Sequence, residues 1–247
     1  MSGRVSVLKI GGSVLTGPPA YRRAATFVGD RLAKAPGERI LAVVSAELGV
    51  TDSLLTMARE IAGDPDRSTL DLLWSTGELR SAALLSLSLQ AAGIKATAVN
   101  VHQTGLVEAA DAGVPGASRL KPLRLRALLA VHDVVVAPGF LARGAGDSVV
   151  SLGRGGSDLT AVLLAAGLEA ARCELLKDVP GYFSADPKRD PGARPLKTLS
   201  YSQAIAMADE GCELVQRQAL VAAREYGVPL LVSAIGHAGG TTVSAEG

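Results

Sequence analysis

A polar segment, Ser151–Thr160 (SLGRGGSDLT), lies between two apolar runs and combines three glycines with charged and hydroxyl side chains. The planar guanidinium of Arg154 matches a carboxylate or a phosphate group. Gly155 and Gly156 would let a ligand approach the backbone closely, and Asp158 could hold a lysine or bind Mg²⁺. A loop with a simple side-chain cap for the next helix is the alternative. The density of these residues favours a binding site.

A second candidate, Leu8–Leu15 (LKIGGSVL), places a lysine before two glycines and a serine. The charge of Lys9 suits a phosphate. Backbone N–H groups around Gly11, Gly12 and Ser13 could form a concave anion site. A tight turn beside a surface lysine explains the same residues equally well. The spacing does not match the Walker phosphate loop.

Two further segments place polar groups near expected helix starts. Within Val43–Leu55, the hydroxyls of Ser45 and Thr51 suit an anion at a helix N-terminus. Within Ser75–Leu85, Glu78 could bind a substrate ammonium group. Taken singly, both segments are explained more simply by helix capping, because a carboxylate or hydroxyl there satisfies free N–H groups.

The fifth segment, Leu175–Pro191, contains the sequence LLKDVPGYFSADPKRDP. A predicted strand ends at Lys177 and Asp178, and a turn with Phe183 and Lys188 follows. Such a segment could wrap a nucleotide, with rings against the base and basic groups toward the phosphates. An ordinary proline-rich loop is an equally good explanation.

Alternating short β-branched runs and longer segments of helical period position these clusters. This pattern predicts an α/β fold, a three-layer αβα sandwich with a mostly parallel central sheet. Ligands bind such sheets beyond the carboxyl ends of the strands, where the polar clusters lie. Strands are expected at Arg4–Ile10, Arg39–Ser45, Ala96–Val101, Asp133–Ala137, Val149–Leu152, Arg172–Leu176, Pro229–Ala234 and Gly240–Ser244. Helices are expected at Tyr21–Ala35, Thr51–Ala62, Leu70–Ala92, Leu159–Gly167, Tyr201–Asp209 and Leu214–Tyr226.

The composition excludes several function classes. Of 247 residues, 48% are hydrophobic, which suffices for a large core. A net charge of +1 and an aromatic content of 3% argue against nucleic-acid binding. The two cysteines lack metal-ligand or disulfide spacing. Neither a secretory signal nor an apolar run of membrane-spanning length is visible. We therefore expect a soluble cytoplasmic protein.

The five segments, in this order, resemble the amino acid kinase family and, within it, the aspartate kinases. The resemblance runs from about Arg4 to Ser244 and rests on LKIGGS, VVSAELGVTDSLL, STGELRSAALL, SLGRGGSDLTA and KDVPGYFSADP. It implies one amino acid kinase domain over 1–247. Within it, a substrate lobe would cover about 1–170 and a nucleotide lobe about 171–247, with the irregular stretch Gly181–Pro195 near the boundary. It also implies a homodimer.

The resemblance further implies ATP-dependent phosphorylation of an amino acid side-chain carboxylate, with L-aspartate giving 4-phospho-L-aspartate and with Mg²⁺ required. Lys9 would contact the transferring phosphate, and Asp158 would orient the catalytic cations. The substrate pocket would comprise Arg154 for the α-carboxylate, Glu78 for the ammonium, and Ser45, Thr51 and Ser157. The ATP site would comprise Gly11, Gly12, Ser13, Lys177, Asp178, Phe183 and Lys188.

Two departures from the aspartate kinase pattern keep alternatives open. Glu213, within Gly211–Arg217 (GCELVQR), stands where those kinases carry a lysine for the ATP phosphates. The sequence also stops at Gly247, where most of them continue into regulatory domains, so feedback control would require a separate regulatory subunit. The alternatives are a weak or inactive nucleotide- or amino-acid-binding homologue, or a kinase for another small carboxylate. A kinase for carbamate or a nucleoside monophosphate is disfavoured by the pair Glu78 and Arg154.

Overall fold

The computed structural model describes residues 4–108, 122–153 and 155–246. The helices are α1 (Pro18–Lys34), α2 (Val50–Ala62), α3 (Arg67–Ala91), α4 (Val101–Thr104), α5 (Leu123–Leu129), α6 (Gly156–Leu168), α7 (Tyr201–Asp209) and α8 (Arg217–Tyr226), with a 3₁₀ turn η1 (Ala145–Asp147). The strands are β1 (Val5–Ile10), β2 (Arg39–Val44), β3 (Ala96–Ala98), β4 (Val134–Pro138), β5 (Leu141–Arg143), β6 (Val149–Ser151), β7 (Arg172–Lys177), β8 (Thr198–Ser200), β9 (Leu230–Ala234) and β10 (Thr241–Ser244).

Eight strands form the central sheet in the order β3-β4-β2-β1-β7-β9-β10-β8. The pairs from β3 to β9 are parallel, and the direction reverses at β10, which is antiparallel to β9 and parallel to β8. Strands β5 and β6 form a separate antiparallel hairpin. The predicted α/β fold with a mostly parallel sheet is confirmed.

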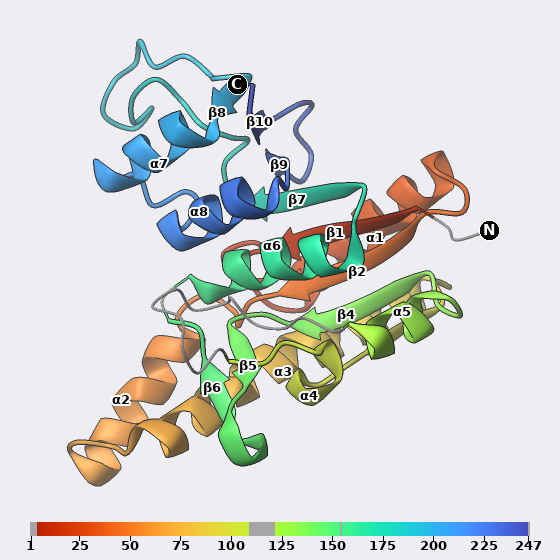
Figure 1. Cartoon of the computed structure of the whole chain (residues 1–247), viewed down its shortest axis with the longest axis vertical. Helices are drawn as coiled ribbons and strands as arrows, with labels where there is room; N and C mark the ends of the chain where they lie inside the picture. The colour runs from red at the N-terminus through yellow and green to blue at the C-terminus, as the bar shows by residue number, and fades with distance from the viewer. Residues whose placement is uncertain (1–3, 109–121, 154, 247) are drawn as a thin grey trace.

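Two apolar cores lie on opposite faces of this sheet, because both faces of the central strands are buried. One core packs residues of α1 and α3 against the sheet, including Tyr21, Val28 and Leu85. The other packs α5, α6, α7 and α8 against the sheet, including Leu164 and Leu220. This is the predicted three-layer arrangement. In Figure 1, α2, α3 and the β5–β6 hairpin gather at one end of the long axis, and α7, α8, β8 and β10 gather at the other.

Most of the expected elements are present within a few residues of the expected bounds. The strand expected at Ala96–Val101 is shorter, because Asn100 caps α4 with a capping box. The helix expected at Leu214–Tyr226 begins later, at Arg217. The sequence analysis did not predict β5, β8, α4, α5 or η1. No helix among the described residues is long and apolar enough to cross a membrane.

The parallel register brings four strand ends to one edge of the sheet. Ile10 is in register with Val44 and with Leu176, and Val44 is in register with Pro138. The segments that follow β1, β2, β4 and β7 therefore leave the sheet side by side. The polar clusters predicted from the sequence lie in these segments or next to them.

Candidate active site

A buried carboxylate bound by two lysines lies at this edge. Lys9 Nζ is 2.9 Å from Asp158 Oδ1, and Lys177 Nζ is 2.7 Å from Asp158 Oδ2. Lys9 comes from β1, Lys177 ends β7, and Asp158 lies in the first turn of α6. The backbone N–H of Gln216 approaches Oδ2 at 3.4 Å. Three residues far apart in the sequence thus form one charged cluster with a net positive charge.

Burial alone would raise the pKa of Asp158, but the charges and hydrogen bonds of Lys9 and Lys177 outweigh it and hold that pKa at about 2. Burial lowers the pKa of Lys177, and the attraction of Asp158 opposes this shift. Asp158 therefore stays ionised at neutral pH. A fixed carboxylate of this kind can hold two ammonium groups in place beside an anion.

The loop after β1 packs tightly against its neighbours. The Gly11 N–H donates to the Leu176 carbonyl at 3.2 Å, and the Gly12 carbonyl accepts from Leu48 N–H at 3.2 Å. A Cβ atom on Gly12 would lie 2.2 Å from the Ala46 carbonyl oxygen, so only glycine fits there. A Cβ atom on Gly11 would be 3.5 Å from Lys9 Nζ and 3.8 Å from Ser13 Oγ. This loop therefore borders the lysine–carboxylate cluster.

A cavity of about 420 Å³ opens between α2, α3, α6 and the β5–β6 hairpin. Four predicted substrate residues line it: Ser45, Thr51, Glu78 and Ser157. Gly155, which the sequence analysis also singled out, lines it too, whereas the other lining residues were missed, namely Ala46, Asp52, Leu55, Arg67, Trp74, Phe140, Ser151 and Gly153. Only the helical period of α3, which repeats at 67, 74 and 78, could have indicated that Arg67 and Trp74 share a face with Glu78. Arg154 lies outside the described residues.

Glu78 is buried in the middle of α3 and does not cap a helix, so the capping interpretation is wrong; Asp66 caps α3. Burial raises the pKa of Glu78 to about 8, against the lowering effects of a hydrogen bond from the Ala46 backbone and of the Lys9 charge. Its Oε2 atom has no hydrogen-bond partner among the described residues. The Glu78 carboxyl is therefore mostly protonated at neutral pH, and a cation that enters the cavity would favour its ionised form.

Capping also fails to explain the polar residues that begin α2 and α6. Gly49 and Gly155 are the N-cap residues, and neither helix has a side-chain cap. Thr51 lies one residue inside α2, while Ser157 and Asp158 lie inside α6. Ser157 packs so closely on Gly139, which follows β4, that a Cβ atom there would be 2.6 Å from the Ser157 Cβ. The hydroxyls of Thr51 and Ser157 are thus available to the cavity.

The predicted ATP-site residues are less closely gathered. Lys177 belongs to the charged cluster, and Asp178 follows it as an exposed residue. Phe183 lines a different cavity of about 460 Å³ beside Tyr182 and Gly240. Lys188 is exposed in a turn, where its N–H donates to Asp186. No hydrogen bond or salt bridge among the described residues joins the side chain of Phe183 or Lys188 to the cluster.

The segment with Glu213 approaches the cluster through its backbone. Glu213 is exposed, and Gln216, three residues later, contacts Asp158. The Gln216 side chain also packs against Gly155, where a Cβ atom would be 1.7 Å from Gln216 Cγ. Glu213 makes no salt bridge within residues 4–108, 122–153 and 155–246. The negative charge at this position is therefore not neutralised by a neighbouring cation in the described part of the chain.

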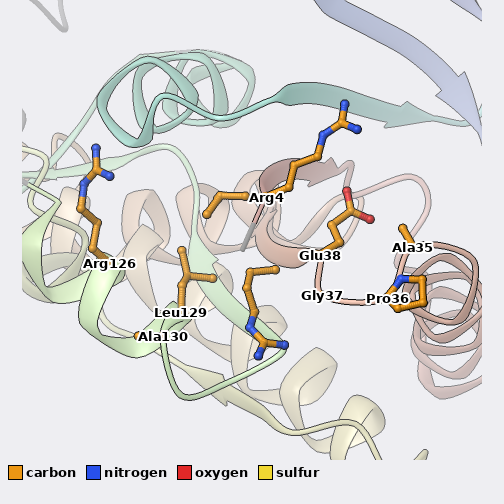
Figure 2. A pocket seen from close by; sticks show the side chains of 10 residues that line it. Arg4, Ala35, Pro36, Gly37, Glu38, Arg126, Leu129 and Ala130 are labelled. Carbon is orange, nitrogen blue, oxygen red and sulfur yellow. The ribbon is translucent and has the colours of Figure 1, made fainter. Parts of the chain in front are cut away.

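A larger cavity of about 870 Å³ lies at the opposite, amino-terminal edge of the strands. It is lined by Arg4, Glu38 and Arg126 among others, and Figure 2 shows that Arg4 and Arg126 extend from separate elements without converging. Glu38 is already bound by Arg31. Size alone therefore does not identify the candidate site, which is the smaller cavity beside the cluster of Lys9, Asp158 and Lys177.

Comparisons with known proteins identify the family of this chain. The model of the amino acid kinase family matches residues 4–233. The aspartokinase of Geobacillus stearothermophilus is 34% identical over 98% of this chain and 59% of its own length, and that of Thermus thermophilus is 39% identical over 79% and 48%. The chain spans about half the length of these relatives.

Solved structures show the same likeness. Aspartate kinase from Synechocystis has a TM-score of 0.83 and 33% identity, covering 98% of this chain and 40% of its own. E. coli aspartokinase III in complex with aspartate and ADP has a TM-score of 0.84 and 25% identity, covering 98% and 64%. Uridylate kinase from Archaeoglobus fulgidus, at 21% identity and a TM-score of 0.68, shares the fold. With its sheet, its charged cluster and the match over residues 4–233, the chain belongs to the amino acid kinase family.

Proposed function

We propose that this chain transfers the γ-phosphoryl group of ATP to the side-chain carboxylate of L-aspartate, giving 4-phospho-L-aspartate and ADP. One observation carries the proposal. A cavity lined by Glu78, a buried carboxyl group with no cation in contact, lies within electrostatic reach of Lys9, which belongs to the cluster with Asp158 and Lys177. An ammonium site thus adjoins a phosphate site. The likeness to aspartokinases supports aspartate as the substrate.

In this proposal the substrate ammonium binds Glu78, and the reacting carboxylate extends toward Lys9. A carboxylate oxygen attacks the γ-phosphorus, a new P–O bond forms, and the bond to the β-phosphate oxygen breaks with its electron pair on ADP. An aspartate side chain has an ordinary pKa of about 4 and is already ionised at neutral pH, so no general base is required. Lys9 and Lys177 neutralise charge on the transferring group, and Asp158 fixes both ammonium groups, because phosphoryl transfer depends on positioning and electrostatics.

The donor set near the cluster fits a Mg²⁺ ion delivered with ATP. The described residues contain no group of three acidic, histidine or cysteine side chains that could hold a metal by themselves. Both oxygens of Asp158 already face lysines. Mg²⁺ would therefore take most of its ligands from phosphate oxygens and water. When bound, it would offset negative charge on the triphosphate, which leaves Asp158 to orient the lysines.

We propose that the other residues singled out in the sequence bind the phosphates, the nucleotide and the substrate. Gly11, Gly12 and Ser13 would line the phosphates, and Asp178, Phe183 and Lys188 would border the nucleotide. Arg154 would bind the α-carboxylate, and Ser45, Thr51 and Ser157 would complete the substrate pocket. The substrate lobe, about 1–170, and the nucleotide lobe, about 171–247, would meet where β1 pairs with β7. A homodimer and a separate regulatory subunit belong to the proposal as well.

A weakly active or inactive binding homologue is the second candidate, and Glu213 is the observation that favours it. Like charges repel, so a carboxylate close to the triphosphate would weaken ATP binding unless it stays in solvent. Glu213 is exposed, as it would be if it turned away. Under the kinase proposal, Glu213→Lys raises kcat/KM for ATP by only a few fold. Under the alternative, it creates activity from an inactive protein.

The test is an ADP-release assay with Mg²⁺ and ATP against L-aspartate, L-glutamate, N-acetyl-L-glutamate, carbamate and UMP. Hydroxylamine trapping should confirm an acyl phosphate as the product. We expect turnover with L-aspartate that Lys9→Met abolishes, whereas Arg23→Ala on the exposed face of α1 should leave it unchanged. ATP binding by calorimetry without turnover of any amino acid would contradict the kinase proposal and support the binding homologue.

A further inference from the structure

One face of α3 supplies three residues to the wall of the candidate substrate cavity. Arg67, Trp74 and Glu78 all line it. Trp74 and Glu78 are four residues apart, so their side chains lie one above the other on the helix, about 6 Å apart along the axis. The wall therefore carries a carboxylate and an indole at neighbouring levels.

Both of these side chains have an unsatisfied polar atom. Trp74 Nε1 and Glu78 Oε2 are buried and have no hydrogen-bond partner among the described residues. Neither atom has solvent-accessible surface, so water does not satisfy them and a ligand would reach them only after a small shift of the side chains that cover them. An indole nitrogen can only donate, and the Glu78 carboxylate can only accept once a bound cation has ionised it. Because unpaired buried polar atoms are rare and costly, a donor and an acceptor left open in one cavity wall call for a ligand that has both complements.

The indole is fixed from two sides. The Arg67 guanidinium lies 5.5 Å from the ring centroid, and the Phe140 ring meets it edge-on at 6.0 Å with an interplanar angle of 62°. Arg67 is itself held, by Asp71 at 3.0 Å and by Ser151 Oγ at 2.6 Å. These contacts connect α3 to the β5–β6 hairpin, which lies beside it in Figure 1. The position of the Trp74 ring is therefore set by its contacts with Arg67 and Phe140.

The positions of Glu78 and Trp74 along the cavity indicate which substrate group would lie near the indole N–H of Trp74. Gly77, next to Glu78, packs on Ala46, and Ala46 also contacts Gly12 of the loop that borders the charged cluster, so Glu78 lies on the side of that cluster. An amino acid with its ammonium on Glu78 and its reacting carboxylate toward Lys9 has its second carboxylate on the same carbon as the ammonium. That carboxylate then lies away from Lys9, at the level of Trp74.

We propose that the indole N–H of Trp74 donates a hydrogen bond to the α-carboxylate of the amino acid substrate. Arg154 is the residue expected from the sequence to bind the same group, and Trp74 would share that role. The inference rests on the proposed function for the identity of the ligand. It makes Trp74 a specificity residue that favours substrates with a free α-carboxylate, while Arg67 and Phe140 position its ring.

The first test exploits the fact that the sequence contains a single tryptophan. In ¹⁵N-labelled protein, the one indole N–H resonance reports on Trp74 alone. Saturating L-aspartate should move this resonance downfield. Saturating 3-aminopropanoate, which keeps the ammonium and the reacting carboxylate but lacks the α-carboxylate, should not. An unmoved resonance at aspartate concentrations that calorimetry shows to be saturating would overturn the proposal.

The second test uses Trp74→Phe, which keeps an aromatic ring against Arg67 and Phe140 but removes the donor. We expect kcat/KM for L-aspartate to fall about tenfold or more through KM, as for a lost bond to a charged group. The KM for ATP and the unfolding midpoint should change little. Unchanged kcat/KM for aspartate, or an equal loss with 3-aminopropanoate, would overturn the proposal.

The two proposals fail in different ways. If wild-type protein binds L-aspartate and shifts the indole resonance but releases no ADP, the kinase function fails and the role of Trp74 stands. If the wild type phosphorylates L-aspartate while Trp74→Phe is unaffected, the kinase function stands and the role of Trp74 fails. If calorimetry detects no aspartate binding at all, both are refuted.

Discussion

Two buried carboxyl groups near the same cavity have pKa values shifted in opposite directions. Asp158 meets the ammonium groups of Lys9 and Lys177, which hold its pKa at about 2 in spite of burial. Glu78 is equally buried but has no cation in contact, and burial raises its pKa to about 8. Carboxyl groups with widely separated pKa values mark different roles at one site. Asp158 is a permanent anion for the lysines, and Glu78 gains its charge when a cation arrives.

This contrast predicts a pH dependence of substrate affinity. Below pH 8 the Glu78 carboxyl is mostly protonated, so binding of a substrate ammonium must release a proton. KM for L-aspartate should therefore fall about tenfold per pH unit as pH rises from about 6 toward 8, and then level off. The measurement is a series of aspartate titrations in the ADP-release assay at saturating ATP.

Glu78→Gln serves as the control for this prediction, because it cannot titrate. Its KM for aspartate should be high and independent of pH between about 6 and 9. A wild-type KM that stays constant across the same interval would contradict the role of Glu78 in ammonium binding. KM for ATP is measured in parallel, since a general pH effect on the enzyme would move both constants.

For individual residues, the sequence indicates which side chains could do chemistry better than it indicates which residues contact each other. Lys9, Asp158 and Glu78 could be singled out because polar groups are unusual directly beside apolar strands and helices. Trp74, Phe140 and Gln216 could not. Their importance arises from contacts between segments that are distant along the chain, such as the edge-on contact of Trp74 with Phe140 and the packing of Gln216 on Gly155.

Among the elements, loop packing sets the position of the charged groups. The helices α2 and α6 begin at glycines in the left-handed conformation, Gly49 and Gly155, without side-chain caps. The loop after β1 is similarly tied to the loop after β2, where the Gly12 carbonyl accepts from Leu48 N–H. Close backbone approach thus sets the distance between the charged cluster of Lys9, Asp158 and Lys177 and the candidate substrate cavity.

Replacing Gly12 tests whether the packing of this loop sets the distance between the cluster and the cavity. A Cβ atom there would lie 2.2 Å from the Ala46 carbonyl oxygen, a backbone atom that cannot move without its loop. Gly12→Ala should lower kcat/KM by about 100-fold, as expected when reacting groups move by about 1 Å. It should also lower the free energy of unfolding by about 1–3 kcal/mol. Steady-state kinetics and urea unfolding measure the two effects.

The matched control is Gly29→Ala, within α1, where the nearest atom to a new Cβ is the Ile94 Cδ1 at 3.4 Å. Alanine is favoured over glycine inside a helix by about 1 kcal/mol, so this variant should be as stable as the wild type or more stable, with normal kinetics. Normal activity of Gly12→Ala would show that the loop tolerates displacement and that its packing does not set the distance between cluster and cavity.

Long and regular helices and strands were predicted from the sequence better than short ones. Continuous apolar strands such as β2 and β4 and the long helices were predicted closely. The strands β5 and β8 and the helices α4 and α5 were missed. These elements have three to seven residues, too few to show a clear period, and β8 pairs only with β10, which lies more than forty residues later.

The whole molecule is built on one sheet that runs through both proposed lobes. Its composition and strand pattern predicted the fold class, because alternating apolar strands and helices leave few other ways to bury both faces. The reversal at β10 could not be predicted, since strand direction at a sheet edge depends on chain path rather than on local sequence.

A second buried ion network connects elements at the amino-terminal side of the sheet. Arg31 of α1 contacts Glu38, which precedes β2, at 2.9 Å, and Glu174 of β7 at 2.7 Å. Ser6 and Ser233 donate to the same two carboxylates. The network joins α1, β1, β2, β7 and β9, and therefore parts of both proposed lobes, well away from the substrate cavity.

Removing Arg31 should destabilise the whole molecule without changing its chemistry. Arg31→Met would leave two buried carboxylates uncompensated, and we expect a loss of about 3–5 kcal/mol in the free energy of unfolding at about pH 7. Burial favours a raised pKa for Glu38, but Arg31 and Ser6 lower it overall, so its contribution is present above the unfolded pKa and is lost as pH falls. The difference in the free energy of unfolding between wild type and variant should therefore narrow at about pH 4.

Urea unfolding at about pH 7 and about pH 4 measures this difference. Arg23→Ala, on the exposed face of α1, is the control and should change the free energy of unfolding by less than about 0.5 kcal/mol. A loss at neutral pH no larger than that of the control, or a difference that widens in acid, would show that the network does not hold the two halves of the sheet together.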